Sequence, residues 1–427
     1  MKLSAKVILL VCFVIFIIGC KKDDPKVLFS DDNFLNALLE SGIDTDGDGA
    51  ISISEAQAVT NLNVSGKSIS DLTGIEQFTN LDSLDCSSNQ LVSLDLSKNT
   101  SLRGLNCSIN QLTYIDITKN IALKWLSCHT NKLSMLDVKA NPGLIVLGCS
   151  NNQLSTLNVS NNPGLVWLLC SQNSLTALDV SNNPDLEQLR CTDNDLNSLN
   201  VTNNSQLLVL ELINNDLVSL DISTNESLLS LDIRGNSINS LDLSANTALQ
   251  SLNCDGNNMS ILDVSHNTSL EWLDFRNNQL TYIDVSNNKR LRYIDCSYNE
   301  IDALDISVNT NLDGLRCEGN SLTTLDISRQ ADMSELYCGM NQLTSLDVTN
   351  QPDLNVLRCN DNQLTELDLS QNTMMGQAGG CYPWYLDISN MPSLTRVCVW
   401  VMPFPPEDFR LNMENSPNVY FTTDCSD

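Results

Sequence analysis

Three aspartates alternate at the start of a short acidic stretch that runs from Asp44 to Glu55. Such a stretch suits calcium, a hard cation that takes about six to eight oxygen ligands. The spacing lets one loop wrap around a single ion, and Gly49 permits the sharp turn that the loop needs. The predicted ligands are Asp44, Asp46, Asp48, the backbone carbonyl of Ala50, Ser52 through a water molecule, and Glu55 through both oxygens.

This stretch resembles the calcium loop of the EF-hand at every constrained position. Apolar residues recur at helical spacing upstream, so we expect a helix to enter the loop and a shorter one to follow from Ser54. The sequence holds one such loop, whereas calcium sensors pair two. We therefore expect calcium to fold an N-terminal cap rather than to act as a switch, with weak affinity, on the order of 0.1–1 mM.

Downstream of the cap that contains this loop, the chain is a long repeat. A cysteine recurs every 21 residues from Cys86 to Cys359, and an asparagine follows three residues after every slot, fourteen times in fourteen. The slots without cysteine hold Leu212, Ile233 and Phe275. Such a period indicates a solenoid, because each coil buries its apolar side only against its neighbours. The slot is therefore a core position, which free cysteine fills as a small hydrophobe.

The repeat reads L-x-x-L-x-C-x-x-N-x-L-x-x-L-D-x-S-x-N-x-x and resembles the leucine-rich repeat, particularly in internalin-like and bacterial surface-lipoprotein members. The resemblance implies a horseshoe-shaped leucine-rich-repeat solenoid with a parallel β-sheet and a mostly non-helical return side. Around Leu84 and Cys86, alternate residues should face inward and outward, as in a strand. Asparagines should form two buried ladders, the second starting at Asn99 and broken by Gln330 and Gln351.

The first twenty residues predict export. Two lysines precede an apolar run that is too short for a comfortable membrane span. The run ends in Ile-Ile-Gly-Cys20, which resembles the lipoprotein box in which the cysteine is lipidated. The following Lys-Lys-Asp-Asp is similar to the tag of surface-exposed lipoproteins of Gram-negative bacteria. We thus expect an outer-membrane protein that is lipid-anchored at Cys20 and exposed on the cell surface.

The domain organisation follows from these motifs. We predict a signal peptide at 1–20, a tether at 21–30, a small helical cap with the calcium loop at 31–61, leucine-rich repeats at 62–372 and a C-terminal cap at 373–427. The chain carries 52 acidic and 23 basic residues, which excludes nucleic acid as a partner because phosphate binding needs a basic face. A disulfide between Cys398 and Cys425 is left open.

Outward-facing strand positions carry the candidate ligand site, because folding does not dictate their identity. The candidates are Trp125, His129, Val146, Trp167, Leu169, Trp272 and Tyr293. Exposed aromatic residues near arginines are typical of protein-binding hot spots. Aromatic rings near carboxylates would also suit stacking on sugars. A third interpretation is that each ring only shields the aliphatic edges of its neighbours.

Catalysis is not predicted. His129 has no serine or cysteine nucleophile placed beside it, because Cys128 faces the core, and His266 lies in a Ser-His-Asn turn on the convex side, where a surface residue is expected. Asp232, Asp274 and Asp295 could be read as paired acids for glycoside hydrolysis. An open sheet offers no enclosed pocket to tune their pKa values, however, and ion pairs with Arg234 and Arg276 explain them more simply.

The sequence therefore predicts a non-enzymatic cell-surface binding protein. Its expected ligand is a protein of a host or neighbouring cell, bound on the concave face of the solenoid, and it would touch the membrane only through the lipid. The alternatives are a glycan-capturing lipoprotein of a nutrient-uptake system and a structural spacer without a specific ligand.

Overall fold

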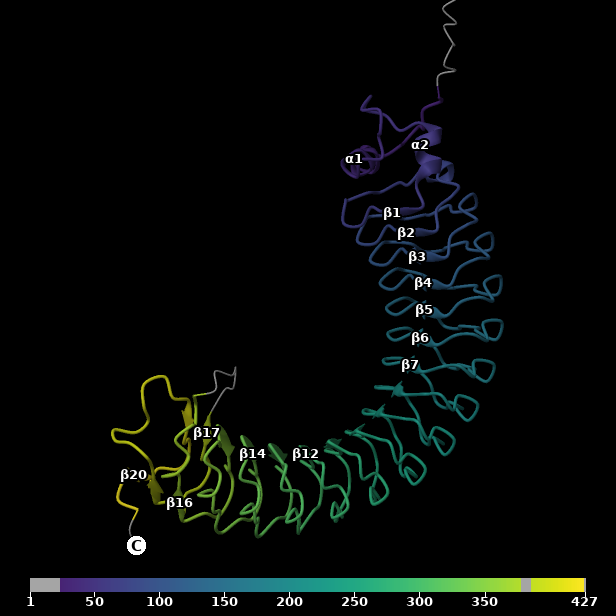
Figure 1. Ribbon diagram of the computed structural model, residues 1–427. Helices are drawn as coiled ribbons and strands as arrows, with labels where there is room; N and C mark the ends of the chain where they lie inside the picture. Colours follow the sequence, from purple (N-terminus) through teal and green to yellow (C-terminus); the bar gives the residue numbers. More distant parts are fainter. Residues whose placement is uncertain (1–23, 378–384, 426–427) are drawn as a thin grey trace, which may run out of the picture.

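The computed structural model describes residues 24–377 and 385–425. The coils stack into an open crescent, with strands along its inner side and return loops along its outer side (Figure 1). A single hydrophobic cluster runs between these two walls from Val27 to Phe404. The predicted leucine-rich-repeat solenoid with its parallel sheet and mostly non-helical return side is confirmed.

The concave wall is one parallel sheet of seventeen strands. The strands are β1 (Asn61–Asn63), β2 (Ser83–Asp85), β3 (Gly104–Asn106), β4 (Trp125–Ser127), β5 (Val146–Gly148), β6 (Trp167–Leu169), β7 (Gln188–Arg190), β8 (Val209–Glu211), β9 (Ser230–Asp232), β10 (Ser251–Asn253), β11 (Trp272–Asp274), β12 (Tyr293–Asp295), β13 (Gly314–Arg316), β14 (Glu335–Tyr337), β15 (Val356–Arg358), β17 (Leu386–Asp387) and β19 (Leu411–Asn412). Pairing joins equivalent residues of successive repeats, as in Leu105 with Leu126. The 22-residue first step pairs Leu62 with Leu84.

The strands alternate as the sequence predicts. Leu84 and Cys86 are fully buried, while Ser83 and Asp85, which precede them, remain partly exposed. The eleven cysteines of the slot are free and buried. Burial raises the pKa of the Cys86 thiol to about 12, so the group stays protonated and unreactive.

The first asparagine ladder ties each coil to the one before it. Asn110 donates from Nδ2 to the carbonyl oxygens of Cys86 and Cys107, both at 3.1 Å. Its Oδ1 accepts from the backbone N–H of Leu91 at 2.9 Å. Because one amide both donates and accepts across the gap between coils, an aspartate could not replace it.

The second ladder lies on the return side and is fully buried. Asn183 donates from Nδ2 to the carbonyl oxygens of Val159 and Asn162, at 3.0 and 2.8 Å. The predicted breaks at Gln330 and Gln351 are wrong. The Nε2 group of each glutamine donates to the equivalent carbonyl oxygen of a preceding coil, at 2.8 Å for Gln330 and 2.7 Å for Gln351. The extra methylene of glutamine lets the same amide group span the gap.

The solenoid continues beyond the region where the sequence pattern fails. Strands β17 and β19 add two coils to the main sheet. A second parallel sheet forms on the return side from β16 (Glu366–Asp368), β18 (Arg396–Cys398) and β20 (Tyr420–Thr422). A disulfide joins Cys398 to Cys425 in these last coils. The C-terminal segment therefore closes the core with degenerate coils.

The N-terminal cap packs against the first coil. It contains helices α1 (Asp32–Glu40) and α2 (Ile53–Ala58), and a 3-10 turn, η1 (Ile75–Gln77), follows in the first coil. Asp31 caps α1 through one carboxylate oxygen, and its other oxygen accepts from the backbone N–H of Ser70 at 2.7 Å. One side chain thus starts the helix and fastens it to the repeats.

Removal of one ladder amide tests this account. We expect Asn215→Ala to lower the free energy of unfolding by about 1–3 kcal/mol, because buried groups of two coils lose their partner. The backbone N–H of Leu196 and the carbonyls of Cys191 and Leu212 are those groups. Urea titration followed by circular dichroism measures the change. The exposed Asn197→Ala is the control, and equal effects of the two variants would contradict a structural role for the ladder.

Candidate functional site

The predicted calcium loop lies between α1 and α2, and its acidic side chains converge. Ligand oxygens of Asp44, Asp46 and Asp48 lie within 4.8 Å of one another. The backbone of Gly49 is left-handed, with φ of 81°, and its N–H donates to Asp44 at 2.9 Å, which closes the loop. Clustered carboxylates around a tight turn are a donor set that fits a hard cation.

Glu55, the last predicted ligand, lies in the first turn of α2. Its carboxylate accepts from the backbone N–H groups of Ser52 at 2.8 Å and Thr45 at 2.7 Å. These hydrogen bonds, that from Ser52 foremost, lower the pKa of Glu55 to about 2, so the group stays ionised near neutral pH. The Ser52 side chain caps α2 and bonds to Glu55, a role additional to the predicted water-mediated one.

A lysine outside the motif already contacts the loop. The segment that precedes α1 pairs with the end of the loop through an antiparallel bridge between Lys26 and Ser52. The Lys26 ammonium lies 2.5 Å from a carboxylate oxygen of Asp48 and 3.9 Å from one of Asp46. Sequence reasoning missed this residue, because the bridge that places it is formed by backbone groups.

The structure brings Trp125, Val146 and Trp167 side by side on β4, β5 and β6. Trp125 and Trp167 are 37% and 41% exposed, although they are large apolar side chains. The Trp125 ring lies over Gly104 of β3, where any side chain would collide with it. The glycine therefore lets the ring lie against the sheet.

The strands around these tryptophans carry no charge at their outward positions. We call this surface the uncharged window: Gly104, Asn106, Ser108, Trp125, Ser127, His129, Val146, Gly148, Ser150, Trp167, Leu169 and Ser171. Burial lowers the pKa of His129, so its ring is neutral at pH 7. The strands that flank the window carry charged residues at their outward positions, Asp85 on β2 and Arg190 on β7.

The second aromatic pair differs, because its rings contact each other. Trp272 and Tyr293 stack with centroids 3.8 Å apart and planes 11° apart. Arg316 lies between the rings of Tyr293 and Tyr337, at 5.5 and 4.6 Å from their centroids. A hollow of about 420 Å³ opens beside the pair over Gly314. This surface is charged, since Arg316 and Glu335 form an ion pair beside the two rings, and Trp272 remains 43% exposed.

The acidic strand residues form ion pairs, as predicted. Arg234 lies 3.5 Å from Asp232. The Arg276 guanidinium lies 3.8 Å from Asp274 and 3.5 Å from Asp295. Burial, with a further contribution from Asp295, raises the pKa of Asp274 to about 7. These carboxylates are held by arginines on an open sheet, which gives no support to a hydrolytic pair.

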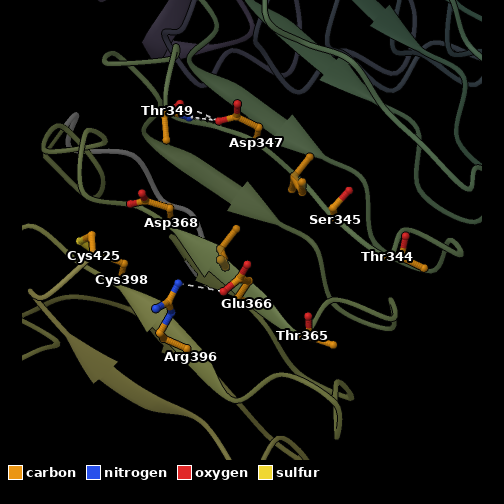
Figure 2. Close-up of a pocket in the computed structure, with 12 residues that line it drawn as sticks. Thr344, Ser345, Asp347, Thr349, Thr365, Glu366, Asp368, Arg396, Cys398 and Cys425 are labelled. Carbon is orange, nitrogen blue, oxygen red and sulfur yellow. Dashed lines mark hydrogen bonds and ion pairs between the residues drawn. A yellow bond between two sulfur atoms is a disulfide. The ribbon is translucent and has the colours of Figure 1, made fainter. Parts of the chain in front are cut away.

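Another hollow, also about 420 Å³, lies on the return side of the last coils, between Thr344 and Arg396 (Figure 2). Arg396 pairs there with Glu366 at 2.9 Å. Asp368 lies near the sulfurs of Cys398 and Cys425, but the disulfide removes both thiolates as metal ligands. The hollow therefore belongs to the C-terminal closure.

One feature of every repeat was missed from the sequence. The second residue after the slot has a left-handed backbone in all fourteen repeats, from Ser88 to Asp361. Glycine, asparagine or aspartate occupies this position in eight of them, which is the signal that could have revealed it. Large apolar side chains occupy it only at Ile109, Tyr298 and Met340, and these are 47–49% exposed.

The predicted lipidation site, Cys20, lies outside the described residues. Among the residues that the structure does describe, no helix is long and apolar enough to span a bilayer.

Comparison with known proteins places the repeats in a family. Residues 268–309 match the family described as Leucine Rich repeats (2 copies). Internalin J of Listeria monocytogenes serotype 4b is 38% identical over 72 residues, which are 17% of this chain and 8% of that protein. A solved leucine-rich-repeat protein of Leptospira interrogans shares the fold, with 23% identity, a TM-score of 0.69, and coverage of 87% of this chain and 97% of the other.

The solved functional domain of InlJ from Listeria monocytogenes, described as including a cysteine ladder, superimposes with a TM-score of 0.77. The two are 33% identical, and the match covers 84% of this chain and 79% of that domain. The chain is therefore a leucine-rich-repeat protein of the internalin type.

Proposed function

We propose that this protein is a non-catalytic binding protein of the cell surface that holds a protein ligand on its concave face, at the uncharged window. The observation that supports this proposal most strongly is the composition of β3–β6. In a chain of net charge −29, the outward positions of these strands carry no ionised group, and two of them are exposed tryptophans.

The window suits a protein interface for physical reasons. An uncharged surface loses little solvation when it is covered, whereas a buried charge must find a partner. Tryptophan supplies a large contact area with few rotatable bonds, which is why it is enriched in hot spots. The bordering charges, including Arg190 paired with Glu211 at 3.3 Å, form a polar rim.

Glycan capture is the less favoured function. Sugar hydroxyls are usually held by carboxylates and amides near an aromatic ring, and the window contains no carboxylate. The acidic surface farther along the sheet places its carboxylates against arginines. We therefore propose that the protein ligand belongs to a host or neighbouring cell and that binding it serves adhesion.

A lipid anchor near the N-terminus would leave the solenoid exposed on the cell surface. We propose that the lipid at Cys20 attaches the protein to the outer membrane and leaves the solenoid exposed. The described chain begins beside the calcium loop, at one end of the crescent (Figure 1). The concave face therefore lies along the body of the crescent, away from the tether.

We also propose that the loop from Asp44 to Glu55 binds calcium. The convergence of three carboxylates, the left-handed turn at Gly49 and the ionised Glu55 support this proposal. Bound calcium would neutralise this charge and hold α1 and α2 together. Its expected role is structural, because the loop lies in the cap and outside the uncharged window.

Binding to arrays of extracellular proteins and glycans tests the main proposal. We expect protein hits that are lost in the double variant Trp125→Ala, Trp167→Ala, because the large apolar contact area is removed. Tyr282→Ala is a control, since this residue is 63% exposed but lies on the return side. Glycan hits that need the tryptophans would favour the uptake function. Silence on both arrays would favour a spacer.

Chelation tests the role of calcium. We expect millimolar calcium to raise the melting temperature, with a dissociation constant on the order of 0.1–1 mM, and Glu55→Gln to abolish that rise. Scanning calorimetry with calcium and with chelator measures it. Array binding at 25 °C should be the same in both conditions, and loss of binding in chelator would show a regulatory role instead.

The Lys26 contact predicts a change in affinity. Calcium must compete with the ammonium group for Asp46 and Asp48, so Lys26→Met should bind calcium about three- to tenfold more tightly. Titration calorimetry measures this directly. Lys67→Met is the matched control, because Lys67 pairs with Glu40 at 2.8 Å. Equal affinities of the two variants would show that Lys26 does not compete.

A further inference from the structure

We propose that Ile109 extends the uncharged window around the edge of the sheet, and that the partner covers it with an uncharged, apolar segment of a protein. This inference rests on the proposed concave-face function. It adds a contact residue that lies outside the strands, and it specifies the chemistry of the partner.

The first argument is the conformational cost. Ile109 has φ of 55°, in the left-handed region that a β-branched side chain avoids. The equivalent residues Asn151, Asn214 and Asn277 adopt the same conformation at much lower cost. An isoleucine there is costly for the backbone and, at 47% exposure, contributes little to the core. The fold requires this conformation in every repeat, so what sets Ile109 apart is a large, exposed apolar side chain at a position where asparagine or glycine would cost less.

The second argument is position. The Ile109 backbone N–H donates to the carbonyl of His129 at 2.9 Å, which places Ile109 beside the edge of the window. Side chains at this position lean toward the next coil, as Tyr298 does over Gly319. Ile109 therefore continues the uncharged surface that includes Ser108 and His129.

The third argument concerns charge and indicates the class of partner. The outward positions of β3–β6 offer no counter-charge to a charged partner surface. The nearest cations, Arg103 and Lys124, precede β3 and β4, and Arg103 is already paired with Asp82 at 3.3 Å. An aliphatic side chain offers neither a hydrogen bond nor a flat ring to a sugar. Covering the tryptophans and Ile109 with an apolar protein surface costs less desolvation free energy than covering them with a polar or charged one.

The test replaces Ile109 by the residue that other repeats use. Ile109→Asn should raise the melting temperature by about 1–3 °C as strain is relieved. Met340→Asn is the matched control: it changes the same backbone position, with φ of 54° and an apolar side chain that is 49% exposed, in a coil far from the window. The probe is a phage-displayed library of random peptides selected on the purified protein in calcium.

We expect selected peptides to be uncharged and rich in aliphatic and aromatic residues. Their binding should weaken about tenfold in Ile109→Asn and stay unchanged in Met340→Asn. Peptides that need the tryptophans but bind Ile109→Asn normally would overturn this inference alone. Binding unaffected by Trp125→Ala with Trp167→Ala would overturn the proposed function as well. Charged peptides, or none, would overturn the apolar partner.

Discussion

The structure depends on the hydrogen bonds that asparagine amides make between successive coils. A parallel stack of short coils exposes backbone donors and acceptors at every bend, and buried groups of this kind must be paired. Asn110 meets that demand by donating to two coils and accepting from one. The second ladder only donates, as Asn183 does to Val159 and Asn162, while its side-chain oxygens have no hydrogen-bond partner among the described residues. Together the two ladders fix the spacing of the coils through polar groups, and the apolar slot fills the core between them. Cysteine, leucine, isoleucine and phenylalanine all occupy it in different repeats, and each is fully buried.

This division of labour leaves the concave surface free to vary. Inward positions supply the core and asparagines supply the bends, so an outward residue such as Trp125 has no structural duty in its own coil. Its ring can lie on the sheet only because Gly104 precedes it, which makes the pair a local adaptation of the surface. The same freedom allows a run of strands without charge inside a strongly acidic chain. A departure from small polar residues on this face therefore reports on ligand binding more directly than a departure in the core does.

Most of the fold could be predicted from the sequence because the repeat period is strict. Features that depend on backbone conformation or on the length of a side chain could not be predicted. The slot, both ladders and the unusual first step could be read from spacing alone. Gln330 looked like a break, yet its longer side chain delivers the same amide to the same carbonyl. The last two coils were obscured because they lack the asparagine pattern. Lys26 was invisible as a neighbour of the calcium loop, since a backbone bridge brings it there.

The ends of the solenoid show why a repeat protein needs more than repeats. Each inner coil covers its neighbours, but the terminal coils would expose core on one side. At the C-terminus, degenerate coils and a disulfide close that side. At the N-terminus, α1 covers it, and Asp31 joins this helix to the first coil. The cap is small, so its stability depends on the loop that links its helices, where several carboxylates repel one another. The cation that we propose for this loop would offset that repulsion and so stabilise the end of the molecule that carries the cap.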